Sequence, residues 1–84
     1  MVDFYASRSM YREQLRDLDY YAQQRESLTD WQETWVEAER AALETGIETG
    51  RRGANPVPYP VPSGLPGNDR AREKWEAYQR SKAA

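Results

Sequence analysis

The chain has 84 residues, at most one small domain, and chains of this length bury a small fraction of their surface. Five Leu, four Val, one Ile and one Phe make 11 of the 84 residues, below the share of about 20% under which a chain is suspect for disorder, yet the net charge is only −2. The lack of Cys and His excludes disulfides, thiolate nucleophiles, imidazole bases and nearly every zinc, haem or iron–sulfur site.

The first predicted element is a helix near residues 4–27. No Gly or Pro occurs from Asp3 to Thr45, and Asp3 fits the N-cap position. The apolar side chains recur at intervals of three, four or seven residues, which makes a narrow stripe of the coiled-coil type; they are Phe4, Tyr11, Leu15, Leu18 and Ala22. Such a stripe predicts a partner helix.

A second helix is predicted near residues 30–48, with a wider apolar surface than the first. Its start fits a capping box, either Thr29 with Gln32 or Asp30 with Glu33. One apolar face holds Trp31, Trp35, Ala38 and Ala42, and the adjacent face holds Val36, Leu43 and Ile47. At its end, either Gly46 or Gly50 can serve as the left-handed cap.

Two arrangements of these helices remain open, because no residue between them compels a break. Residues 1–53 form either an antiparallel helical hairpin or one continuous helix of roughly 70 Å at 1.5 Å per residue. We favour the hairpin, since it lets the two apolar stripes bury each other within one chain. The single long helix would need another chain.

Residues 54–67 contain all five prolines and predict an extended Pro-rich strap, or linker. Val57, Tyr59 and Val61 alternate with proline, a spacing that suits a groove or a sheet edge, and Leu65 follows. The segment has no P-x-x-P or P-P-x-Y motif, which argues against a ligand for SH3 or WW domains.

A third, short amphipathic helix is predicted in residues 68–84. Asn68 or Asp69 fits its cap, and Ala71, Trp75 and Tyr78 are spaced four and three residues apart. A helix of this length is marginal in water alone, so we expect it to dock through Trp75.

The charge divides with these segments. Residues 1–53 carry 11 acidic and 7 basic side chains, a net −4, whereas residues 68–84 carry 3 acidic and 5 basic ones, a net +2. The basic side chains around Trp75 suit nucleic acid, but the overall acidity and the lack of a recognisable motif argue against nucleic acid as the main partner. A basic face around a docked Trp explains the same residues.

The candidate binding residues are mainly aromatic. Trp31 and Trp35 lie one helical turn apart and predict a core, which in a chain so poor in Leu and Ile is in part an intermolecular one. The full predicted set for binding a partner is Tyr21, Trp31, Trp35, Val57, Tyr59, Val61, Leu65, Trp75 and Tyr78.

Catalysis has little support in the sequence. No Glu-x-x-His metal motif or glycine-rich phosphate loop is present, so we expect no enzyme activity, no cofactor and no metal. The N-terminus lacks a basic region followed by an apolar run, and no stretch approaches about 18 apolar residues. We therefore expect neither signal peptide nor membrane span, and a soluble protein, either intracellular or part of a virion.

The composition predicts a small structural or accessory protein that ties together larger subunits or copies of itself, for example in a viral particle. The alternative is a regulatory or inhibitor protein that docks its acidic helical hairpin on a basic surface of a target enzyme. An acidic mimic should lose affinity steeply with salt, whereas Trp-anchored binding should not.

Overall fold

The computed structural model describes residues 4–61, 65 and 67–83, together with the side chains from Ser7 onward in these ranges. These residues contain no strand and form three α-helices, which are α1 (Phe4–Gln23), α2 (Asp30–Thr49) and α3 (Asn68–Ala83). The predicted all-α class is therefore confirmed. The N-cap predicted at Asp3 lies outside the described residues.

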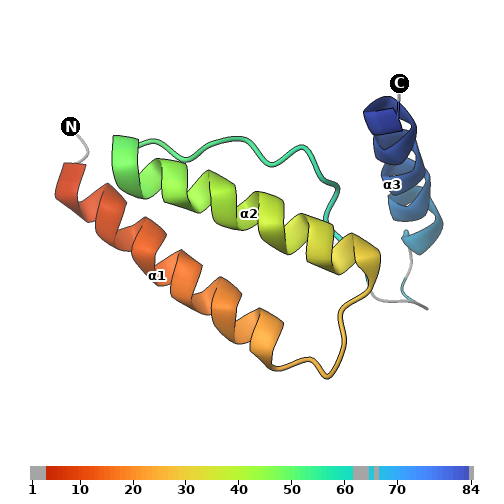
Figure 1. The fold of residues 1–84 in the computed structure, drawn as a ribbon, viewed down its shortest axis with the longest axis horizontal. Helices are drawn as coiled ribbons and strands as arrows, with labels where there is room; N and C mark the ends of the chain where they lie inside the picture. Colours follow the sequence, from red (N-terminus) through yellow and green to blue (C-terminus); the bar gives the residue numbers. More distant parts are fainter. Residues whose placement is uncertain (1–3, 62–64, 66, 84) are drawn as a thin grey trace.

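Helices α1 and α2 lie side by side and run in opposite directions (Figure 1). The core between them is a buried cluster of Leu18, Val36 and Leu43. The half-buried side chains that pack against this cluster are Tyr11, Leu15, Tyr21, Ala22 and Trp35. Apolar side chains of the two helices thus pack against each other.

Two polar side-chain contacts join α1 and α2. Near the start of α1, Arg8 Nη2 donates to the carbonyl of Glu48 at 2.8 Å. Near the end of α1, Asp19 forms an ion pair with Arg40 of α2. The first contact pairs the beginning of α1 with the end of α2, and the second pairs the end of α1 with the middle of α2.

Residues 24–29 connect the two helices, and α1 ends at Gln23 rather than near residue 27. A capping box starts α2: Thr29 Oγ1 accepts from the Gln32 amide at 3.2 Å, and Gln32 Oε1 accepts from the Thr29 amide at 2.9 Å. The structure thus selects Thr29 with Gln32 from the two predicted boxes, since both reciprocal bonds are made.

The two glycines near the end of α2 have different roles. Gly50 is the cap, with a left-handed φ of 83° and its amide bonded to the carbonyl of Gly46 at 2.8 Å. Gly46 lies inside the helix and is buried under the ring of Tyr11. A side chain at Gly46 would collide with that ring, so glycine permits the close approach of α1.

After α2 the chain turns back and residues 51–61 pass along that helix without regular structure (Figure 1). Polar bonds attach this segment to α2: the Gly53 amide donates to Ala42 O at 3.0 Å, and Trp31 Nε1 donates to Pro58 O at 2.6 Å. Val57 is buried at 5% exposure. The segment therefore adds an apolar side chain to the interior.

Helix α3 lies beyond the beginning of α2 (Figure 1) and, in the described residues, buries only Ala71. Its contact with α2 is made by Trp75, which stacks on Trp31 with ring centroids 5.5 Å apart and an angle of 14°. Residues 79–83 are all exposed. Helix α3 is thus positioned by this aromatic stack and by the burial of Ala71. No described helix is long and apolar enough to cross a membrane.

Candidate protein-binding surface

The described Trp and Tyr side chains lie around the small core rather than inside it. The buried apolar residues are aliphatic, namely Leu18, Val36, Ala42, Leu43, Val57 and Ala71. Every Trp and Tyr whose side chain is described is half-buried or exposed. Partly exposed aromatic rings are typical of protein interfaces, because they combine a large apolar area with little loss of side-chain entropy.

One group of rings lines a groove between α1, α2 and residues 51–61. We call it the aromatic groove; it has a volume of about 310 Å³ and is lined by Gln14, Asp17, Leu18, Tyr21, Trp35, Glu39, Leu43, Arg52 and Tyr59. Trp35 meets Tyr21 edge-on at 6.2 Å and 65°, and meets Tyr59 edge-on at 5.0 Å and 89°. The rings thus stand at steep angles to one another, over a floor of Leu18 and Leu43.

Charged groups surround the aromatic groove. The Glu39 side chain is 14% exposed and pairs with Arg52, and its Oε1 also accepts from Asn55 Nδ2 at 3.4 Å. Asp17 lies exposed on the α1 side. The guanidinium of Arg25 lies 3.8 Å from the ring centre of Tyr21. The groove therefore combines aromatic walls with two carboxylates, of which Glu39 is paired with Arg52 and Asp17 is exposed.

A second group of rings lines a groove between the start of α2 and α3. We call it the helix-junction groove; it has a volume of about 350 Å³ and is lined by Thr29, Asp30, Trp31, Gln32, Pro60, Val61, Asn68, Arg72 and Trp75. Tyr78 extends the stack, 5.6 Å from Trp75 at 22°. The indole N–H of Trp31 is already bonded within the chain, so this groove offers chiefly apolar contact.

The structure divides the predicted binding residues between these places. Tyr21, Trp35 and Tyr59 line the aromatic groove, and Trp31, Val61 and Trp75 line the helix-junction groove, with Tyr78 stacked beside it. Leu65 is 51% exposed and Val57 is in the interior. The side chain of Val57 is therefore covered by the chain itself.

Sequence reasoning missed the polar residues of the aromatic groove. The carboxylate of Glu39 pairs with Arg52 and accepts from Asn55, so residues of the chain itself cover it. Asp17 lies one helical turn before Tyr21, a spacing that contained a usable signal. The pairing of Glu39 with Arg52, 13 residues away, has no local signal.

The described residues contain no group of three or more carboxylates placed to hold a metal ion. The absence of enzyme activity stays a prediction. Comparison with protein-family models, curated proteins and solved structures finds no match to this chain. A functional interpretation must therefore come from the two grooves and the charges around them.

Proposed function

We propose that this chain is a small non-catalytic structural or accessory protein that ties together subunits of a larger assembly, of which a viral particle is one example. In this proposal residues 1–53 act as a helical hairpin, residues 54–67 as an extended strap and residues 68–84 as a docking helix. The observation that carries it is that no described Trp or Tyr side chain is fully buried, and that rings which pack on the small core also line two open grooves.

The proportions of the fold support an interaction role. The buried core of the described residues consists of a few aliphatic side chains, and α3 adds only Ala71 to it. A chain with so little buried area is marginally stable, and a partner that binds only the folded form stabilises it by mass action. Tyr and Trp are also the residues that most often dominate binding energy at interfaces.

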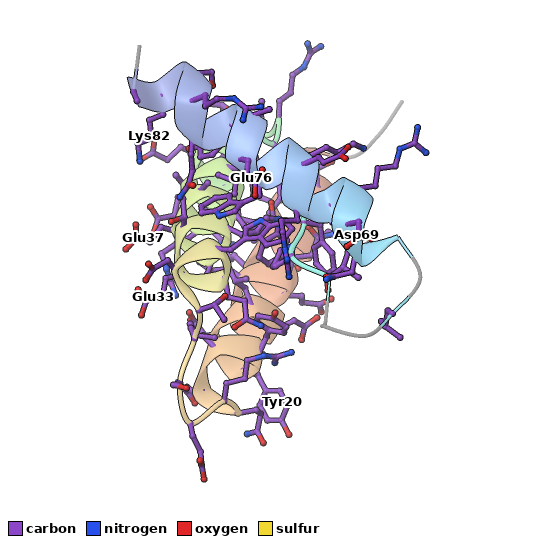
Figure 2. All side chains as sticks on the ribbon, turned by 90° about the vertical axis from the view of Figure 1, so that its right-hand side faces the viewer. Tyr20, Glu33, Glu37, Asp69, Glu76 and Lys82 are labelled. Carbon is purple, nitrogen blue, oxygen red and sulfur yellow. The ribbon has the colours of Figure 1, made fainter. Side chains whose placement is uncertain are left out.

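Two exposed tyrosines provide a matched test. Tyr59 is 57% exposed on the aromatic groove, whereas Tyr20 is 64% exposed near the end of α1, outside both grooves (Figure 2). Neither ring is a core residue, so both alanine variants should fold. We expect Tyr59→Ala to weaken association and Tyr20→Ala to leave it unchanged.

The measurement is light scattering after size-exclusion chromatography at low and high concentration, with capture of partners from source cells as its complement. Association or capture that Tyr59→Ala reduces and Tyr20→Ala does not supports the proposal. A chain that stays monomeric and captures nothing overturns it. Equal effects of the two variants overturn the role given to the groove.

A second candidate is a regulatory inhibitor that docks an acidic helix face on a basic enzyme surface. It is favoured by a row of exposed carboxylates on α2, formed by Glu33, Glu37, Glu44 and Glu48, of which the first two project to one side in Figure 2. An inhibitor should bind one target copy with a steep loss of affinity in salt. An assembly component should repeat with symmetry and respond less to salt.

A further inference from the structure

We propose that the aromatic groove binds the basic C-terminal end of α3 from a second copy of this chain, with the side chain of Arg80 or Lys82 between the rings. This inference rests on the proposed assembly function and names the partner. Copies would then join head to tail, each giving its helix end to one neighbour and its groove to the other.

The groove has the chemistry of a site for a cationic side chain. Tyr21, Trp35 and Tyr59 bring three rings to one cavity, with Trp35 edge-on to each of the other two. A cation over a ring face is attracted by the ring quadrupole, most strongly where water is excluded. The exposed carboxylate of Asp17 adds a negative charge at the rim.

Arginines of the same chain already show that guanidinium groups fit these surroundings. Arg25 stacks on the ring of Tyr21 at 3.8 Å, and Arg52 pairs with Glu39 within the groove lining. Arg52 neutralises Glu39, which leaves Asp17 as the lining carboxylate exposed for an incoming cation. The described residues thus hold one cation–ring contact and one arginine–carboxylate ion pair beside the cavity.

The chain itself carries a matching ligand. Arg80 and Lys82 lie in the last turn of α3, where residues 79–83 are all exposed. The ion pairs found among the described residues lie within α1, α2 and residues 51–61, and none involves α3. Residues 68–84 carry a net +2 and residues 1–53 a net −4, so the two regions of different copies attract.

The C-terminal end of α3 lies where a second copy of the chain can reach it. Trp75 stacks on Trp31 at the beginning of α2, and from there the helix runs away from α1 and α2 to its C-terminal end (Figure 1). The C-terminal end of α3 therefore lies beyond the start of α2 rather than along the α1 and α2 pair (Figure 1). A contact between two different surfaces is heterologous, and it builds rings or open chains of copies rather than a closed two-fold dimer.

Charge reversal with rescue tests this contact on the full chain. One variant reverses the groove with Asp17→Arg, and the other reverses the helix end with Arg80→Glu and Lys82→Glu together. Each variant alone should associate about tenfold more weakly than the wild type, which is the scale of one lost ion pair plus a cation–ring contact. An equimolar mixture should recover association, because each reversed surface then meets its complement.

Two further variants separate this contact from general charge effects. Glu37→Arg makes the same charge change as Asp17→Arg on an exposed face of α2 outside the grooves, and should leave association unchanged. Tyr59→Leu keeps the charge and removes a ring, and should weaken association. Circular dichroism on each variant checks that the helices persist.

Sedimentation equilibrium up to about 1 mM covers the range of weak self-association. Loss in both reversal variants with recovery in the mixture supports the contact. Loss without recovery, unchanged association in either reversal variant, or a wild type that stays monomeric overturns it. If neither reversal changes association, the contact proposed here is wrong, but the assembly function can still act through another surface. The assembly function itself is overturned only if the wild type stays monomeric and also captures no partner.

Discussion

Replacing Gly46 by alanine tests the packing of α1 on α2. A β-carbon at this position would lie 2.6 Å from Cδ2 and 2.9 Å from Cε2 of Tyr11. Favourable carbon contacts are about 3.5–4.0 Å, so the ring would have to move by about 1 Å. The backbone at Gly46 is helical, and alanine meets no conformational penalty there.

Two opposing effects set the expected change in stability. Alanine is better than glycine in a helix interior by up to about 1 kcal/mol. Forcing extra volume into a packed contact costs about 1–3 kcal/mol. We therefore expect Gly46→Ala to lower the free energy of unfolding by up to about 2 kcal/mol. In a Tyr11→Ala background the collision is absent, so Gly46→Ala should raise the free energy of unfolding by up to about 1 kcal/mol.

Urea denaturation of the wild type, both single variants and the double variant gives the coupling free energy, expected at about 1–3 kcal/mol. The matched control is Ala41→Gly, which measures the glycine and alanine difference at an exposed site of the same helix. A Gly46→Ala variant more stable than the wild type, or a coupling near zero, would refute the close approach of Tyr11.

Three further predictions concern the dock, the cap and the core. Trp75→Ala removes the stack on Trp31, so the amides of α3 should lose their protection in hydrogen exchange while those of α1 and α2 keep theirs. Loss of all helical signal would contradict the idea that α3 is held separately from α1 and α2. Thr29→Ala should cost about 1 kcal/mol in urea unfolding and a serine there much less, because the hydroxyl caps α2. Leu43→Ala, at a side chain only 2% exposed, should cost about 2–5 kcal/mol, whereas Leu65→Ala, at 51% exposure, should stay within about 0.5 kcal/mol.

The candidate surface was predictable in its kinds of residue but not in its arrangement. Rarity of Leu and Ile beside many Trp and Tyr already indicated an aromatic interface. The grouping of Tyr21, Trp35 and Tyr59 was not predictable, because it joins three segments through edge-on contacts between residues 14 to 24 positions apart. Periodicity reports which face a residue occupies and carries no information on which distant face meets it.

Local signals in the sequence determined the elements. The absence of Gly and Pro from Asp3 to Thr45, the capping residues and the three-and-four spacing predicted helical structure in residues 4–48 and 68–81, but left open whether the first stretch is one helix or two. These features act over a few residues, through backbone hydrogen bonds and side chains one turn apart, and a single chain displays them directly.

Only the tertiary structure distinguishes residues whose local sequence is the same. Gly46 and Gly50 stand in identical Glu-Thr-Gly triplets, yet one is buried under Tyr11 and the other is the left-handed cap. Glu39 resembles its solvated neighbours in sequence and is covered by Arg52 in space. Both outcomes depend on contacts between residues far apart along the chain, and such contacts form only once the helices pack.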